Sequence, residues 1–204
     1  MENQVNLKGP DGVGLFHGHE EIADGKGNFK DGWRDGLWEI YWDDGTVCAK
    51  GHYREGKKEG HWKTYLKTGE FSSEGNYIND QKDGTWKSYW SNGSLLWKIN
   101  YKNGKEDGLE EFYWEKGGVV STGNNKNDES EGLWKYFRET GELGFTGHYK
   151  DGKLEGPWYT YRENGKLEFR RDYKKGFLHG IWEEYDEEGN LIKTKTYKDG
   201  ELVE

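Results

Sequence analysis

A spacing of 24 residues recurs along most of this chain. Gly60-His61-Trp62 returns as Gly84-Thr85-Trp86, and the same anchor glycine opens seven successive units without any insertion, at Gly36, Gly60, Gly84, Gly108, Gly132, Gly156 and Gly180. Self-similarity at a fixed period of roughly 20–50 residues is the signature of a repeat architecture. The period therefore predicts a row of equivalent structural units in place of a single globular core.

Several other columns keep the same phase and are interpreted as structural anchors. A ring follows the anchor glycine by two residues at Trp38, Trp62, Trp86, Trp134, Trp158 and Trp182, with Glu110 as the exception. A second ring follows it by five residues, at Tyr41, Tyr65, Tyr89, Tyr113, Phe137, Tyr161 and Tyr185. Before the first full unit, Gly12, Gly27, Phe29 and Gly32 keep the phase more weakly. Residues 1–35 are therefore expected to form an N-terminal segment with a degenerate capping repeat, and residues 36–204 seven repeats continuous with it in one domain.

Each unit of 24 residues has room for two short strands and two turns. Trp38–Trp42 and Val47–Tyr53 are interpreted as strands, Asp43–Thr46 as a turn, and Arg54–Glu59 as the return loop. Glycine recurs too often for helices, because each glycine costs roughly 1 kcal/mol in a helix interior. The expected fold is all-β: an elongated single-sheet antiparallel meander of about 15 strands, built as a solenoid of hairpins.

The register of each hairpin is left open by one residue. A four-residue turn places Trp38 opposite Gly51, where the ring would cover the glycine backbone. A three-residue turn instead places Tyr41 opposite Val47. Because three residues separate the Trp and Tyr columns, either a bulge brings them to one face or the sheet is aromatic on both faces.

The segment from Gly51 to Tyr65, GHYREGKKEGHWKTY, resembles the MORN repeat, and more closely its bacterial variant with G-x-W-x-x-Y-x-x-x-G spacing. That variant occurs in proteins resembling the YwqK-type antitoxin family. The resemblance spans nearly the whole chain and implies a curved sheet of hairpins that binds or scaffolds other proteins. For YwqK-like members it implies neutralisation of a toxin partner, and it implies no catalytic residues.

Composition bounds the location and class of the protein. Only 31% of its 204 residues are hydrophobic, but 11 Trp and 14 Tyr at fixed phase supply enough large apolar area for a folded chain. No stretch approaches the about 20 apolar residues of a membrane span, and Met1–Leu15 lacks a signal-peptide pattern. The lone Cys48 indicates no disulfide. A cytoplasmic protein is expected.

No column indicates catalysis, a metal site or a cofactor. His52 and His148 share one column four repeats apart, roughly 38 Å in an extended sheet, and His17 with His19 is a weak two-ligand pair. A carboxylate precedes most anchor glycines, as at Glu59 and Glu131, and is interpreted as capping backbone N–H groups of turns. The protein is therefore expected to be a non-enzyme.

Columns that vary are where a partner would be recognised. The candidate contact residues are the surplus tryptophans Trp42, Trp90, Trp97 and Trp114 and the acidic residues Glu183, Glu184, Asp186 and Glu187. The surplus rings lie near Glu110 and Asn125, which replace a Trp and a Tyr, so they are either exposed hot spots or volume that refills a gap. Both interpretations remain open.

Net charge limits the class of partner. The chain carries −9, and residues 179–204 hold eight Asp or Glu against three Lys. Nucleic acid is not expected, because phosphate binding rests on a basic surface, and anionic lipid is disfavoured for the same reason. The leading hypothesis is a protein-binding module, an immunity protein or antitoxin that blocks a toxin domain, which could be basic. The alternatives are a structural or oligomeric scaffold, as a monomer or an edge-paired homodimer, and a carbohydrate- or phospholipid-binding repeat protein.

Overall fold

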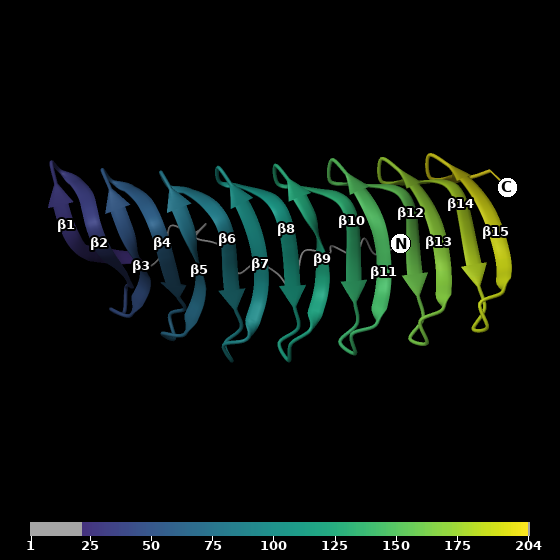
Figure 1. Cartoon of the computed structure of the whole chain (residues 1–204), viewed down its shortest axis with the longest axis horizontal. Helices are drawn as coiled ribbons and strands as arrows, with labels where there is room; N and C mark the ends of the chain where they lie inside the picture. Colours follow the sequence, from purple (N-terminus) through teal and green to yellow (C-terminus); the bar gives the residue numbers. More distant parts are fainter. Residues whose placement is uncertain (1–21, 204) are drawn as a thin grey trace.

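The computed structural model describes residues 22–203, which form one open antiparallel sheet of sixteen strands (Figure 1). Each strand is hydrogen-bonded to its neighbours in chain order. The strands are β1 (Ile22–Lys30), β2 (Trp33–Trp42), β3 (Val47–Arg54), β4 (Lys57–Tyr65), β5 (Phe71–Ile78), β6 (Gln81–Tyr89), β7 (Leu95–Lys102), β8 (Lys105–Tyr113), β9 (Val119–Lys126), β10 (Glu129–Phe137), β11 (Leu143–Lys150), β12 (Lys153–Tyr161), β13 (Leu167–Lys174), β14 (Phe177–Tyr185), β15 (Leu191–Lys198) and β16 (Glu201–Leu202). The expected meander of hairpins is confirmed.

Within residues 22–203 no helix is long and apolar enough to cross a membrane. The early part of the expected N-terminal segment, with Gly12, His17 and His19, lies outside the described residues. Gly27 and Phe29 lie in β1, and Gly32 lies in the turn that follows it.

Two kinds of turn alternate along the sheet, and the short ones have two residues. Between β3 and β4 these residues are Glu55 and Gly56, with φ angles of 50° and 80°. Positive φ at both positions defines a type I′ turn, whose twist matches that of the flanking strands. The expected return loop over Arg54–Glu59 is therefore wrong in extent. Strand β4 already begins at Lys57, because so tight a turn lets pairing resume at once.

The longer turns settle the register. Trp38 pairs with Gly51 and Tyr41 pairs with Val47 in the same hairpin, so both registers that the sequence allowed are present. They are compatible because the register shifts just before Tyr41, which leaves Cys48 as an extra residue in a bulge. The same shift recurs in the later hairpins of this kind.

The bulge does not bring the two ring columns to one face. The Tyr41 hydroxyl donates a hydrogen bond to the Glu39 carboxylate at 2.6 Å, so these two side chains share a face. Trp38 directly precedes Glu39 and therefore lies on the opposite face. We call the face that carries Trp38 and its column the tryptophan face, and the other the tyrosine face. The sheet is aromatic on both sides.

The core is a row of rings on the tryptophan face. Edge-to-face contacts with centroid distances of 4.9–6.1 Å run without a break through Phe29, Trp38, Tyr53, Trp62, Tyr77 and Trp86. Trp38, Trp62 and Trp86 are at most 2% exposed. Fully burying a large apolar side chain is worth about 1.5–3 kcal/mol. One layer of rings thus takes the place of the second layer that an ordinary sheet needs.

Candidate functional site

Each buried tryptophan lies against a glycine of the preceding strand. A Cβ placed on Gly51 would lie 2.2 Å from the Trp62 ring, so only glycine fits beneath it. The Trp62 Nε1 donates to the carbonyl oxygen of His52 at 3.1 Å, which fixes the ring over the strand. The expected aromatic-over-glycine packing is therefore present, but the ring over Gly51 belongs to Trp62 and not to Trp38. Trp38 likewise leans toward the preceding strand and covers Gly27.

In the first three repeats a cation lies over the rings. Lys82 Nζ lies 4.7 Å from the Trp86 ring centroid and 4.5 Å from that of Tyr101. Arg34 and Lys58 hold the same position, hereafter the cation position, at 4.7–5.4 Å from their rings. Burial lowers the pKa of Lys82 to about 8, partly offset by Glu106. These cation–π contacts close the tryptophan face over its first half.

The fourth repeat departs from the pattern in a concerted way. Glu106 takes the cation position, Glu110 takes the Trp column, and Asn125 takes the column of Tyr101. The buried Asn125 amide donates to both carboxylates, and the hydroxyl of Tyr101 donates to Glu106. Ile99 stands where other repeats have the glycine, directly opposite Glu110. The repeat that lacks the tryptophan, at Glu110, therefore also lacks the glycine that a tryptophan would cover, because Ile99 stands there.

The last repeats depart in a different way. Arg171 and Lys195 take the glycine column, and Leu154 and Leu178 take the cation position. Trp182 pairs with both Arg171 and Lys195 across its two neighbouring strands. Trp158 and Trp182 are only half-buried, whereas Trp134 and the earlier tryptophans of the column are buried. The sequence analysis missed Arg171 and Lys195, although their place in an otherwise glycine column was a readable signal.

The surplus tryptophans Trp42, Trp90, Trp97 and Trp114 are all half-buried on the tryptophan face. Trp42 and Trp97 pack against the core cluster. The Nε1 of Trp90 donates to the carbonyl oxygen of Tyr113 in the next repeat at 3.3 Å. In the same column the arginines of the fifth and sixth repeats make the equivalent bond, at 2.6 and 2.7 Å. Trp90 therefore helps to join two repeats, and its part in contacting a partner stays a prediction.

The acidic residues of the C-terminal end do not form one patch. Glu183 lies on the tyrosine face, opposite Arg170 at 3.6 Å, and also accepts a hydrogen bond from Tyr185. Glu184 lies on the tryptophan face. Asp186 accepts two hydrogen bonds from Asn190 in its own turn, and Glu187 is exposed beside it. Because side chains alternate between the two faces of β14, Glu183 and Glu184 lie on opposite faces, and Asp186 and Glu187 lie in the turn that follows.

Three of the carboxylates that precede the anchor glycines cap turns, as expected for this column. Glu59 accepts a hydrogen bond from the backbone N–H of Asn79 at 3.1 Å. Glu131 and Glu155 do the same for Asp151 and Lys175, at 3.2 and 2.8 Å. Each acceptor lies 20 residues before its donor, so these bonds tie successive short turns together. This column is therefore structural in those three repeats.

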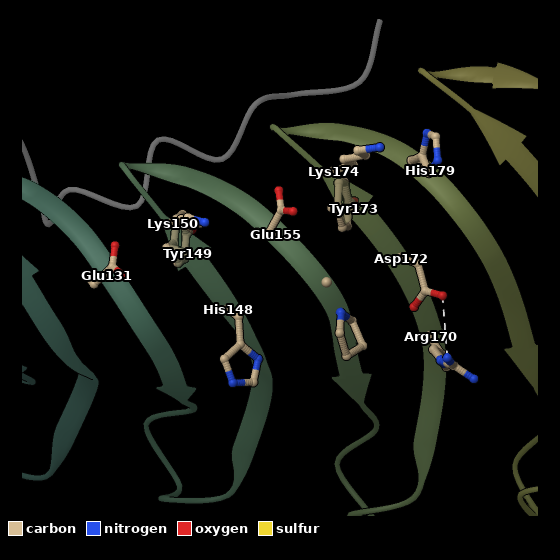
Figure 2. Close-up of a pocket in the computed structure, with 12 residues that line it drawn as sticks. Glu131, His148, Tyr149, Lys150, Glu155, Arg170, Asp172, Tyr173, Lys174 and His179 are labelled. Carbon is tan, nitrogen blue, oxygen red and sulfur yellow. Dashed lines mark hydrogen bonds and ion pairs between the residues drawn. The ribbon is translucent and has the colours of Figure 1, made fainter.

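A hollow of about 730 Å³ lies over β10–β14 on the tyrosine face (Figure 2). His148, Pro157 and Asp172 are among the residues that line it, and Arg170 donates to the Asp172 carboxylate at 3.4 Å. Glu131 and Glu155, which cap turns, stand at one rim (Figure 2). The lining side chains carry both signs of charge, so the hollow presents a mixed polar surface.

Among residues 22–203, no three His, Cys, Asp or Glu side chains come together as metal ligands. The comparisons with known proteins agree with the repeat architecture. The family model described as a MORN repeat variant matches residues 34–55, 82–103, 154–175 and 178–199. Each match begins at the cation position and spans one Trp strand with the strand that follows it. No curated protein matches the chain. The chain therefore carries repeats of the MORN variant type in these four segments.

Proposed function

We propose that this chain is a non-enzymatic repeat module that binds another protein. The observation that carries the proposal is that the constant columns of the repeat form the internal contacts, while the variable columns determine the surface. Columns that keep phase are used in internal contacts, such as Trp62 over Gly51 and Glu59 capping the next turn. Columns that vary change the exposure and charge of a face while the backbone path stays the same. Repeat proteins with such a scaffold present extended binding surfaces, and the MORN variant matches favour the same class.

The finer proposal is an immunity protein or antitoxin that acts in the cytoplasm by blocking a toxin domain. The net charge of −9 favours a protein partner over nucleic acid. The exposed Glu187 and its neighbours would suit a basic toxin domain. The direct test is co-expression of the chain with each neighbouring reading frame of its native genome. Restored growth of cells that one of those frames kills, together with a stable purified complex, is the expected result.

A complex whose formation does not restore growth would reject the antitoxin role and keep the binding module. No complex and no protection with any neighbouring frame would contradict the antitoxin proposal altogether. The predicted contact rings are tested in the same assay. Replacing Trp90, Trp97 and Trp114 together by Phe keeps most of their packing volume. Undiminished protection by that folded variant would remove these rings from the contact surface.

A second candidate, an oligomeric scaffold, is favoured by where the exposed apolar side chains lie. Phe29 and Trp33, at one end of the sheet, are 66% and 62% exposed, and Leu191 and Ile192, at the other end, are 51% and 57% exposed. Association of copies through these ends would cover them. The mass of the full chain in solution discriminates the two candidates: a concentration-independent monomer contradicts the scaffold.

A further inference from the structure

The C-terminal part of the tryptophan face differs from the rest in accessibility. We call this part the open half and define it by residues Trp158, Phe169, Arg171, Trp182, Lys193 and Lys195. All six are half-buried or exposed. In the preceding repeats Trp62, Trp86 and Trp134 occupy the same column at no more than 4% exposure. The open half therefore presents to solvent rings that elsewhere form the core.

Substitutions in two columns accompany this accessibility, although Trp158 still lies over Gly147. Arg171 and Lys195 replace the glycine over which a tryptophan would lie flat, so the Trp182 ring has no glycine on either side. Leu154 and Leu178 replace the cation that covers the rings of the first three repeats. The cations that lie over rings therefore come from the glycine column here, at Arg171 and Lys195, and no longer from the cation position.

The cations of the open half lie at the surface and form no ion pair with a carboxylate in the described part of the chain. The Arg171 guanidinium lies 4.7 Å from the Phe169 ring centroid, and Lys195 Nζ lies 4.9 Å from that of Trp182. Within residues 22–203 neither forms an ion pair, and nor does Lys193. Arg170, one residue away on the tyrosine face, pairs with two carboxylates. The open half therefore carries unpaired positive charge on a chain whose net charge is negative.

We infer that the open half is a docking surface for an acidic segment of a protein partner, with apolar side chains lying on the rings and carboxylates meeting Arg171 and Lys195. The inference rests on the proposed protein-binding function and names the chemistry of one contact. Guanidinium binds carboxylate through two parallel hydrogen bonds, and tryptophan and arginine are the residues most often found as hot spots. Arg171, Lys193 and Lys195 outnumber Glu184, which lies opposite Lys193, and this excess of positive charge sets the sign of the partner.

The test uses the full chain and a fluorescein-labelled decapeptide of alternating glutamate and tyrosine, followed by anisotropy at low salt. Three further probes are the same peptide with lysine for glutamate, the same peptide with glutamine, and a 20-nucleotide oligothymidylate. The glutamate peptide is expected to bind best. Preference for the lysine peptide would overturn the inference and favour contact through the acidic end. Preference for the oligothymidylate, or equal binding of the glutamine peptide, would also overturn it.

Charge-matched variants locate the contact. R171E together with K195E is expected to weaken binding of the glutamate peptide about tenfold or more, the loss of two charge-assisted contacts. The control, K63E with K135E, makes the same charge change on the tyrosine face and is expected to have less than about a threefold effect. E184Q is expected to strengthen binding. Equal losses in the two charge-reversed pairs, or weaker binding by E184Q, would contradict the placement.

If the glutamate pair fails to fold, R171M with K195M keeps the apolar stems beside the rings and should still lose binding. Retained binding by that folded variant would refute the role of the two cations. Failure of the antitoxin proposal is distinguishable, because peptide binding needs no toxin. Protection of growth without peptide binding refutes only the docking surface, and peptide binding without protection refutes only the antitoxin role.

Discussion

Replacing Gly75 by Ala is expected to destabilise the protein, although alanine is usually better tolerated in a strand than glycine. The φ of Gly75 lies outside the left-handed region, so the backbone itself accepts a side chain. A Cβ there, however, would lie 2.2 Å from the Trp86 ring. Restoring a contact distance of about 3.5 Å requires the ring or the strand to move by about 1.3 Å.

The structure gives the ring little freedom to make that movement. Trp86 is fully buried, its Nε1 donates to the Asn76 carbonyl oxygen at 2.9 Å, and its ring meets that of Tyr77 at 4.9 Å. Overpacking costs about 1–3 kcal/mol, and the lower entropy of the unfolded alanine chain offsets about 0.4–1 kcal/mol. A net loss of about 1–2 kcal/mol is expected, read from the midpoint of urea unfolding at unchanged slope.

Gly144 provides the matched control. It also lies in a strand outside the left-handed region, but its nearest neighbour to a Cβ is a backbone oxygen at 3.5 Å, an ordinary contact. Gly144→Ala should therefore leave the stability unchanged or raise it by up to about 1 kcal/mol. A Gly75→Ala variant as stable as the Gly144→Ala variant would refute the role assigned to the tryptophan over the glycine.

Three further predictions concern other contacts. Trp90→Phe removes the bond to the next repeat and should cost about 1 kcal/mol in urea unfolding, whereas Trp33→Phe, at an exposed ring, should cost nearly nothing. Because the folded pKa of Lys82, about 8, lies below the value of about 10.4 in an unfolded chain, the unfolded chain binds more protons between those values. Stability should therefore rise between pH 8 and pH 10, and the rise should be smaller in Lys82→Met; equal rises would contradict burial as the cause. Glu110→Trp should destabilise the chain by meeting Ile99, and adding Ile99→Gly should restore stability, with a coupling of about 1–3 kcal/mol in a double-mutant cycle; additive effects would contradict the compensation.

Much of the fold was predictable because the period fixes it. The long turn over Asp43–Thr46 was deduced from spacing alone. Spacing left Trp38 opposite Gly51 and Tyr41 opposite Val47 as alternative registers, and the structure contains both. What spacing could not give was the bulge at Cys48, since one extra residue in a strand leaves no mark on a period of 24. The short type I′ turn was missed for a related reason: Glu55 is not a residue type that signals a positive φ.

The candidate contact residues were harder to predict, because exposure depends on neighbouring strands that a column does not reveal. Trp90 varies within its column, yet it bonds to the next repeat. Glu183 and Glu184 are adjacent in sequence and lie on opposite faces. Arg171 varies in a column that is otherwise mostly glycine, and a cation there is a stronger departure from the repeat than a variable ring or carboxylate. The surplus tryptophans and the acidic residues of the C-terminal end both remain predicted contacts with a partner.

The most direct test of the account is small-angle X-ray scattering of the monomeric full chain, because a single sheet with one layer of rings cannot be compact. Fifteen spacings of about 4.8 Å give a sheet about 72 Å across, with strands about 30 Å long. Those dimensions correspond to a radius of gyration of about 23 Å, whereas a globular domain of this length has about 17 Å. A value of about 23 Å or more is predicted, and one near 17 Å would contradict the open sheet.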